Sequence, residues 1–448
     1  MRGRDFLGRR PCARSPLPYL QGEWRRGRFL LLALGAVWGT AAGAEPQSFV
    51  QALEEMAQKN PRVISAGYLV RAAEADVAGA RSAYRPQLGV TTDFGWSGAT
   101  TYSPAGVSIL PEVRVSQLVF DGGRTPAEIR RRRIRVDLLG VQEQATLADL
   151  SLQLAHAWLD YSRQSELVGV SQQQVAALMV LDGLVTEIAG FDRGRASDVV
   201  MVESRLQQAR TALYSRQIAL SEARGRIREV SSLPVEPQGA VPDAGKALPA
   251  NIDACLALVP ASPAARLASL QVDEGQEAER ATRNWWAPNL AVEAARTSER
   301  TALGDTRLLN GFALRLRASV LPFDSGGGKA RHTSSLAALE AARATARGTE
   351  VMLRDRVERL WTFQSDRAGR LPELEDLVGR SDQARDIVFE QFRLGRRTIL
   401  DVLSYDLERF NVRAQLVNER FDIAQTRYQL LGTLGLIYQA ASSAEQGA

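Results

Sequence analysis

Three short sequence patterns occur twice in this chain, in the same order and about two hundred residues apart. The first pattern is PQLGVTTDFGW from Pro86, which corresponds to PNLAVEAART from Pro288. The second is LVFDGG from Leu118, which corresponds to LPFDSG from Leu321. The third is FDRGRASDVV from Phe191, which corresponds to FRLGRRTILDV from Phe392. The offsets are 202, 203 and 201 residues. Three matches at one spacing indicate an internal duplication, so the chain is expected to fold as two copies of one unit.

The duplication divides the chain at a segment rich in proline and glycine. Residues 233–262 are predicted to form a linker between a first repeat at 45–232 and a second repeat at 263–440, with a flexible tail at 441–448. Residues 1–44 are predicted to be a secretory signal peptide, because arginines precede a short apolar run that ends in small residues. No transmembrane helix is evident after this leader.

The charge balance of the remaining chain argues against a nucleic-acid partner. Residues 1–44 carry eight arginines against Asp5 and Glu23, so removal of the leader lowers the net charge from +5 to about −1. The basic character therefore belongs to the leader. Cys12 leaves with it, and the remaining Cys255 cannot form an intrachain disulfide or a thiolate metal site by itself.

Each repeat contains two stretches in which apolar and polar residues alternate. Residues 88–96 and 107–116 show this period of two in the first repeat, and residues 312–320 and, more weakly, 290–294 show it in the second. The alternation predicts strands with one apolar face. Four such strands fit either a soluble β-layer or a transmembrane barrel, and their length of about ten residues and the aromatic residues near their ends favour the barrel.

Helical patterns occupy the rest of each repeat. Residues 47–83 have apolar residues at helical spacing, and residues 124–188 predict a helix on the order of 100 Å long at about 1.5 Å per residue. Breaks at 192–195 and 395–397 are expected to turn the chain back, and Pro372 is expected to interrupt the second long helix.

Four strands are too few to close a barrel in lipid. The smallest closed barrels need about eight strands, and an open edge leaves unpaired backbone groups that cost several kcal/mol each. The chain is therefore expected to oligomerise through its strands. A dimer would give a bore of eight strands that side chains fill, whereas a trimer with twelve strands would leave an open bore.

Over residues 47–440 the chain resembles the TolC-type outer membrane factor family. The resemblance lies in the duplicated FDGGR-like turn, in YRPQL and WAPNL before the strands, and in G-x-x-T-I-L-D-V-L from Gly395. It implies a mainly α fold with a transmembrane β-barrel, in which four strands per chain form a shared 12-stranded barrel in a homotrimer, continued by a long periplasmic α-helical barrel. It also implies contact with outer-membrane lipid and docking of a periplasmic adaptor (membrane fusion) protein and an inner-membrane transporter, with the ABC type favoured.

The resemblance also assigns roles to residues at the periplasmic end. In the family a tyrosine and an arginine of the second repeat bond to an acid of the first, and the matching positions here are Phe392, Arg397 and Val200. Since phenylalanine has no hydroxyl and valine no carboxylate, Asp198 is expected to substitute as the acid and the latch to be loose. The constricting acidic rings map to Asp401, which is kept, and to Ser404, which is not.

Two further groups of residues are expected to matter. The adaptor is expected to contact the tips, which are Gly194, Arg195, Gly395 and Arg396. The turns that lead from strand to helix are expected to consist of Asp121, Gly122, Gly123, Asp324 and Gly326. Glycine suits such turns because it accepts backbone conformations that other residues avoid.

No motif predicts an enzyme or a cofactor. The GGGK segment at 326–329 lacks the upstream glycine and the following Ser or Thr of a phosphate loop. His156 and His332 have no partner at ligand spacing. The chain is therefore interpreted as a passive outer-membrane exit duct. The DRGRASD and FDGGRT segments resemble members that serve type I secretion of polypeptides, including large adhesins; the alternatives are small-molecule efflux or a periplasmic coiled-coil scaffold or adaptor.

Overall fold

The computed structural model describes residues 46–97, 106–301, 309–321, 323–438 and 440. The chain divides into two units, of which the first, Met1–Gly43, lies outside the described residues. The predicted signal peptide at 1–44 and the predicted tail at 441–448 lie outside them too. All described elements belong to the second unit, Ala44–Ala448.

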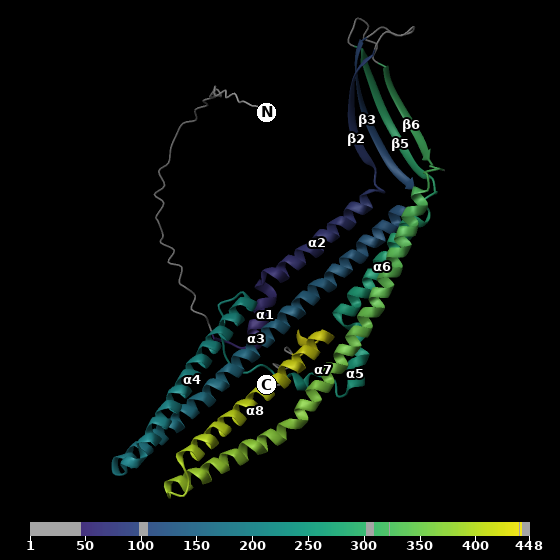
Figure 1. Ribbon diagram of the computed structural model, residues 1–448. Coiled ribbons are helices and arrows are strands. Elements are labelled where there is room, and N and C mark those ends of the chain that lie inside the picture. The colour runs from purple at the N-terminus through teal and green to yellow at the C-terminus, as the bar shows by residue number, and fades with distance from the viewer. Residues whose placement is uncertain (1–45, 98–105, 302–308, 322, 439, 441–448) are drawn as a thin grey trace, which may run out of the picture. The chain divides into compact units, whose positions relative to one another are not determined.

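The two halves of this unit contain the same series of elements, which are short helices, two strands, a long helix and a return helix (Figure 1). The first series is α1 (Phe49–Lys59), α2 (Pro61–Ser82), β2 (Gln87–Ser97), β3 (Gly106–Phe120), α3 (Arg124–Phe191) and α4 (Ala196–Ser231). The second is α5 (Ile252–Leu258), α6 (Pro263–Arg283), β5 (Asn289–Thr301), β6 (Leu309–Ser319), α7 (Gly327–Arg393) and α8 (Ile399–Leu434). The short strands β1 (Pro46–Gln47) and β4 (Glu236–Pro237) pair in parallel beside α1.

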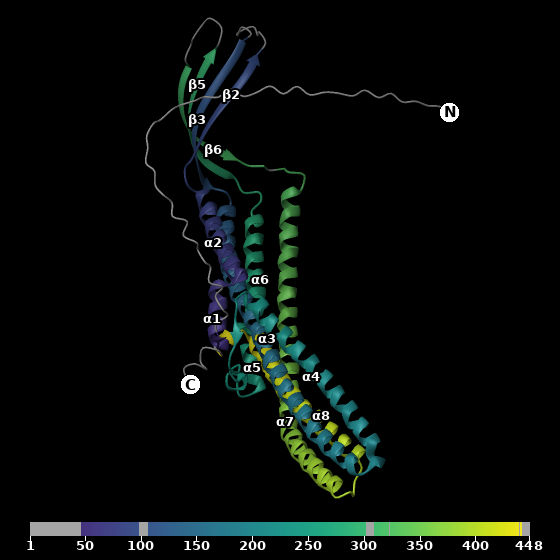
Figure 2. The ribbon, with the colours of Figure 1, turned by 90° about the vertical axis from the view of Figure 1, so that its left-hand side faces the viewer.

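The helices lie side by side in four columns (Figures 1 and 2). The first column consists of α2 and α4, the second of α3, the third of α6 and α8, and the fourth of α7, and each column packs along the next. The helices α3 and α7 contain 68 and 67 residues. Each is therefore on the order of 100 Å long at about 1.5 Å per residue, as predicted for the first of them.

The two composite columns are joined where one helix ends and the next begins. The side chain of Asn60 caps the start of α2, and its Nδ2 donates to the carbonyl of Val230 near the end of α4 at 3.2 Å. In the other column Gly435 ends α8 with φ 77°, and a Cβ at this position would lie 2.6 Å from Cδ of Pro263, the first residue of α6. The end of each lower helix thus fixes the start of the upper one.

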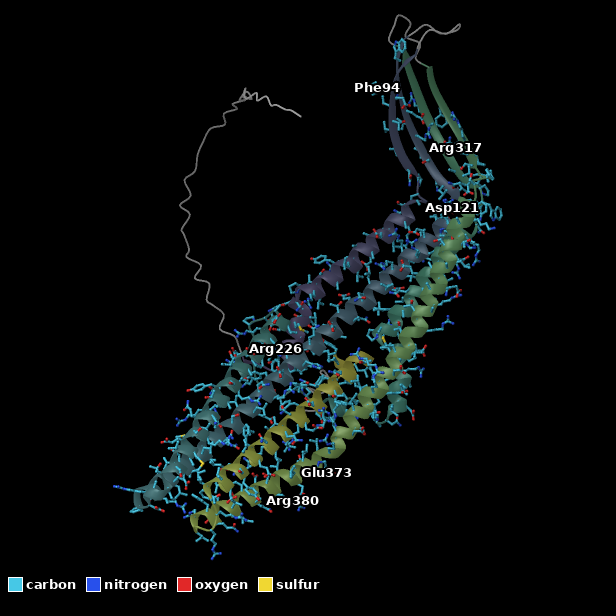
Figure 3. All side chains as sticks on the ribbon, viewed as in Figure 1. Phe94, Asp121, Arg226, Arg317, Glu373 and Arg380 are labelled. Atoms are coloured by element: carbon cyan, nitrogen blue, oxygen red, sulfur yellow. The ribbon has the colours of Figure 1, made fainter. Side chains whose placement is uncertain are left out.

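Pro372 does not interrupt α7, contrary to the sequence-based expectation. The helix continues from Gly327 to Arg393 with the proline inside it. Proline removes one N–H donor and crowds the carbonyl four residues earlier, and a helix that is packed along its neighbours accommodates this by bending instead of ending. The helix α7 changes direction in the lower part of Figure 1, and Figure 3 labels Glu373 beside the proline.

The sequence interpretation also overlooked two helical stretches that are long and apolar enough to cross a membrane. They lie in α3, with a mean hydropathy of 1.5, and in Ile252–Arg283, with 1.2. In α3 the buried side chains of Leu178, Leu181 and Val185 belong to a cluster shared with α4, α7 and α8. Length and composition alone do not separate membrane crossing from packing between helices, and 17% of the apolar stretch in α3 is buried within the described chain.

The four long strands form one antiparallel sheet in the order β2-β3-β5-β6. Residues predicted for the apolar face lie opposite one another in neighbouring strands, as in Leu88–Val115, Val90–Val113, Val292–Leu316 and Ala294–Leu314. Residues between them point to the other face, where Glu293 lies opposite Arg315. The predicted alternation of faces is confirmed, with one register shift between Leu118 and Phe120.

The segment predicted as a linker forms a packed layer on the columns. Its chain passes over Trp158 of α3 and Tyr428 of α8, which are both buried together with Phe49 of α1. The indole N–H of Trp158 donates to the carbonyl of Gly239 at 3.2 Å, and the hydroxyl of Tyr428 donates to the carbonyl of Pro242 at 2.8 Å. The layer thus covers one face of α3 and α8 at the level where the composite columns are joined.

Candidate functional site

The turn that links β3 to α3 is organised by one aspartate. The Oδ1 of Asp121 accepts a hydrogen bond from the N–H of Gly123 at 3.2 Å, and its Oδ2 accepts from the N–H of Thr125 at 2.7 Å. These amides belong to the first turn of α3, where N–H groups have no partner within the helix. Gly122 and Gly123 have φ of 72° and 90°, so the chain can turn sharply between strand and helix.

The turn that links β6 to α7 repeats this geometry with different residues. Asp324 accepts hydrogen bonds from the N–H groups of Gly326, at 3.1 Å, and Gly328. Gly326 has φ of 87°, and Ser325, which occupies the position of Gly122, also has a positive φ of 55°. Both turns pack against the segment before β5, since a Cβ at Gly328 would collide with the ring of Trp285. The two exits from the sheet are therefore equivalent despite their different sequences.

Both edges of the sheet lack a partner strand within the part of the chain that the structure describes. The edge strands are β2 and β6, and the first and fourth helix columns are the outer columns beneath them. These outer columns expose large apolar side chains, which include Tyr68, Val200, Tyr214 and Ile218 in the first column and Met352 and Ile387 in the fourth. Large exposed apolar side chains that gather on one helix face indicate an interaction surface.

The tips of the two helical hairpins come together in one cleft. Its lining includes six residues that were predicted for the gate or for adaptor contact: Arg195, Asp198, Gly395, Arg396, Arg397 and Asp401. The cleft has a volume of about 580 Å³. Gly194 lies in the turn before α4, where its N–H donates to Oδ1 of Asp192 at 3.0 Å. Residues about two hundred positions apart in the sequence thus share one site.

The contacts inside this cleft differ from the expected latch. Phe392 is only 2% exposed, and the guanidinium of Arg195 lies 5.9 Å from the centre of its ring. Asp198 lies 3.9 Å from Arg195, while Nε of Arg397 donates to Oε1 of Gln391 at 3.1 Å. An ion pair between Asp198 and Arg397 is not present among the described residues. The ring of Phe392 thus makes a cation–π contact with Arg195 and packs in the tip, where a tyrosine could form a hydrogen bond.

Asp401 caps the start of helix α8, in addition to the role that the resemblance implies. Its Oδ2 accepts from the N–H of Thr398 at 3.0 Å and from the Thr398 hydroxyl at 2.9 Å, and these bonds cap the start of α8. The bonds from the backbone and hydroxyl of Thr398, together with the charge of Arg397, lower the pKa of Asp401 below its usual value. Ser404, one turn later, is exposed and donates to the carbonyl of Leu400 at 2.8 Å.

A chain of ion pairs crosses all four columns, and sequence reasoning missed it. The pairs are Arg226–Asp160 at 3.1 Å, Asp160–Arg163 at 2.9 Å, Arg163–Asp422 at 3.1 Å and Asp422–Arg367 at 2.6 Å. They link α4 to α3, α3 to α8, and α8 to α7. The sequence carries no signal for them, because charged residues on long helices are common and their partners lie up to 259 positions away.

The described residues contain no group of three or more His, Cys, Asp or Glu side chains placed to hold a metal ion. Cys255 is fully buried, and burial raises the pKa of its thiol. Residues 327–329 of the GGGK segment form the first turn of α7. The four helix columns thus form a wall with two open edges. Two similar turns connect it to the sheet, and the two hairpin tips share one cleft.

Comparison with known proteins identifies the same architecture elsewhere. No family model matches the sequence. The outer membrane efflux protein BepC of Brucella suis biovar 1 (strain 1330) is 24% identical over 411 residues, which cover 88% of this chain and 87% of that protein. The solved structure of CusC superposes with a TM-score of 0.78 at 12% identity, covering 88% of this chain and 93% of that one. The outer membrane protein VceC of Vibrio cholerae gives 0.76 at 16% identity, covering 86% and 96%. The predicted fold class, long helices with a small four-stranded sheet, is confirmed.

We expect Gly122→Ala to destabilise the protein more than Gly123→Ala. Both residues have positive φ, where a side chain costs roughly 1–2 kcal/mol. At Gly122 a Cβ would also lie 2.5 Å from Cβ of Ala287, whereas at Gly123 nothing lies within 4 Å. Thermal unfolding of the detergent-solubilised variants, followed by circular dichroism, measures the difference. Equal melting temperatures for the two variants would contradict the steric contribution.

Proposed function

We propose that the chain is a TolC-type outer membrane factor, which its similarity to BepC and to the structures of CusC and VceC supports, and that it is the outer-membrane exit duct of a tripartite transport system. It lies in the outer membrane and extends into the periplasm as a homotrimer, with a periplasmic adaptor protein and an inner-membrane transporter as partners. The observation that carries this proposal is that the sheet and the helical wall are open at corresponding edges. Another copy of the chain satisfies both edges at once.

Three copies fit the faces of the sheet. Twelve strands enclose an open bore, whereas the eight strands of two copies enclose one that side chains fill. The apolar face, with Val90, Leu314 and Leu316, then faces lipid. The other face, on which Arg317 pairs with Glu293 at 3.0 Å, faces water in the bore. This assignment suits these side chains, and Arg296, which lies opposite Val113 and Phe312 on the apolar face, is the exception.

The tip cleft is the proposed periplasmic gate and adaptor contact. Gly194, Arg195, Gly395 and Arg396 lie in the turns at the ends of the hairpins, where a docking protein reaches them first. Asp401 near the start of α8 is the proposed ring of three carboxylates. Because Phe392 packs under Arg195 and lacks a hydroxyl, the tip is held by contacts that a small rearrangement of Arg195 would release.

Two kinds of cargo fit this duct. The segments at 192–198 and 120–125 resemble members that serve type I secretion, with an ABC transporter and a large secreted polypeptide such as an adhesin. The relative BepC carries the name of an efflux protein, which supports export of small molecules at least equally. The proposal therefore commits to the duct, and the choice of transporter decides the cargo.

Cysteines at matching heights on the outer columns should crosslink neighbouring copies. Val200 lies four residues after the start of α4 and Ile387 six residues before the end of α7, so both exposed side chains lie close to the tips. The double variant Val200→Cys/Ile387→Cys is expected to run as covalent dimers and trimers on non-reducing gels. The control Val200→Cys/Met352→Cys should not crosslink, because Met352 lies roughly 50 Å higher on α7. Monomers alone in both variants would contradict the trimer.

Asp401→Asn should weaken channel block by multivalent cations such as lanthanum by on the order of tenfold, since it removes three negative charges from the ring. The asparagine oxygen still accepts from Thr398, so the helix cap is kept. Because the pKa of Asp401 is lowered from 3.8, the wild-type ring stays ionised and block should persist at pH 5. The control is Glu390→Gln, because Glu390 is an exposed acid near the end of α7 that lies at the tip. Unchanged block in bilayer recordings of Asp401→Asn would contradict the acidic ring.

The transporter that copurifies with the tips identifies the cargo class. A photo-crosslinking amino acid at Arg195 or Arg396 is expected to capture the adaptor, and with it the inner-membrane transporter. Recovery of an ABC transporter supports polypeptide secretion, whereas a proton-driven pump supports efflux. The same crosslinker at Arg354, on α7 far from the tips, is the control. Capture at Arg354 but not at the tips would contradict the proposed docking surface.

A further inference from the structure

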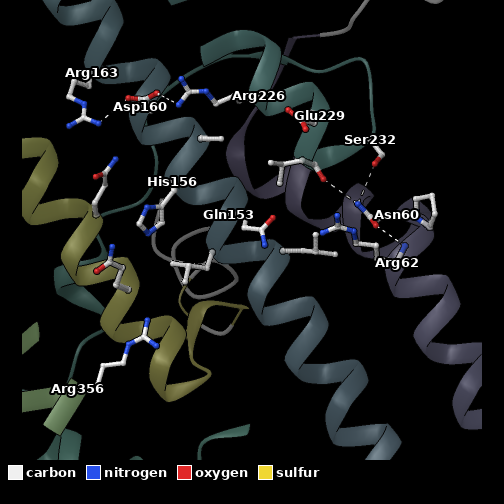
Figure 4. Close-up of a pocket in the computed structure, with 17 residues that line it drawn as sticks. Asn60, Arg62, Gln153, His156, Asp160, Arg163, Arg226, Glu229, Ser232 and Arg356 are labelled. Atoms are coloured by element: carbon white, nitrogen blue, oxygen red, sulfur yellow. Dashed lines mark hydrogen bonds and ion pairs between the residues drawn. The ribbon is translucent and has the colours of Figure 1, made fainter. Parts of the chain in front are cut away.

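A groove of about 890 Å³ lies on one face of α3. Residues from all the columns line it (Figure 4). Arg62 comes from α2, Arg226 from α4, His156 and Arg163 from α3, and Arg356 from α7. The groove is therefore a feature of the wall as a whole.

The groove lies on the face of the wall that the linker layer leaves free. The linker packs on the side of α3 that carries Trp158, whereas His156 and Arg163 point to the groove. Three copies of the linker, with α1 and α5, cannot fit inside a bore and still leave it open, so this layer belongs on the outside of the trimer. The opposite face, with the groove, then lines the bore.

Positive charge exceeds negative charge in the groove. Four arginines line it against two acids, Asp160 and Glu229. The carboxylate of Asp160 is already engaged, since it accepts from Arg163 at 2.9 Å and from Arg226 at 3.1 Å. Arg62 and Arg356 are exposed and form no ion pair with any residue that the structure describes. These two guanidinium groups, which lie on opposite sides of the groove in Figure 4, are each available to a ligand.

His156 adds a polar group to the floor of the groove. Its Nε2 is buried and has no hydrogen-bond partner among the described residues. Burial lowers the pKa of His156, and the positive charge of Arg163 lowers it further. The imidazole is therefore neutral at neutral pH, and it contributes hydrogen bonding beside the arginines without adding to their repulsion.

We propose that this groove is a binding site in the bore for small anions that carry two or more phosphate or carboxylate groups. The inference rests on the proposed function, because the trimer places three such grooves around one channel. Arginine suits the ligand, since its planar fork donates two parallel hydrogen bonds to a carboxylate or phosphate. The proposed ring of Asp401 at the tip and the basic groove would then act in series, so that the groove retains anionic cargo after it passes the gate.

Inorganic tripolyphosphate is the probe for this site. Isothermal titration calorimetry of the detergent-solubilised protein is expected to show binding at low salt, and Arg62→Gln/Arg356→Gln should weaken it at least tenfold. Arg62→Lys/Arg356→Lys keeps the charge but loses the planar fork, so its affinity should lie between those of the wild type and the glutamine variant. Arg354→Gln is the matched control, because Arg354 is exposed on the same helix as Arg356 but pairs with Glu350 at 3.1 Å outside the groove. No binding to the wild type, or equal binding to the wild type and the glutamine variant, would overturn the site.

Bilayer recordings separate this inference from the proposed function. Tripolyphosphate should block the wild-type current, and the glutamine variant should require at least tenfold more of it for the same block. Channels that conduct normally but show no block would overturn the anion site and leave the duct intact. A protein that binds tripolyphosphate by calorimetry yet forms no conducting channel would instead contradict the proposed function.

Discussion

The open edges of the sheet are the constraint on which the rest of the structure depends. A strand in lipid must pair all of its backbone N–H and C=O groups, because each group left unpaired costs several kcal/mol. Within the described chain, β2 and β6 each pair on one side only. No rearrangement of four strands removes this deficit, since four cannot close on themselves. The fold is therefore complete only as a ring of several copies.

The helical wall inherits its order from the sheet. The strands lie in the order β2, β3, β5, β6, and the helices connected to them lie in the corresponding order α2, α3, α6, α7. One column therefore continues each strand, and the Asp121 and Asp324 turns make the connection for the two long helices. Closure of the sheet then also closes the wall. The exposed apolar side chains of the outer columns fit this role, because they lie along the edges that must meet.

The sequence predicts features that repeat or alternate along the chain. It does not predict contacts between helices that lie far apart in the sequence. The duplicated turns, the strand faces and the long helices follow from local periods that a single chain displays. The chain of pairs from Arg226 to Arg367 and the groove around His156 require knowledge of which helix faces meet. The sequence places Phe392 at the tip, but its burial under Arg195 depends on how the helices pack. The predicted break at Pro372 is wrong, because the neighbouring columns support a helix that would end at this proline if it were isolated.

In the proposed trimer the balance of charge along the bore differs between the tip, the column joints and the barrel. The tip cleft presents Asp198 and Asp401 together with Arg195, Arg396 and Arg397. The groove at the column joints presents an excess of arginine, and the barrel face pairs Arg114 with Glu112 at 2.7 Å. A conducting path needs sites that attract cargo enough to admit it and release it soon enough to pass it on. Exposed arginines in a wide, hydrated bore meet this requirement, because water and salt screen their attraction. A long polypeptide would span several of these zones together, whereas a small anion would meet them one after the other, so the basic groove would act more strongly on small cargo than on large.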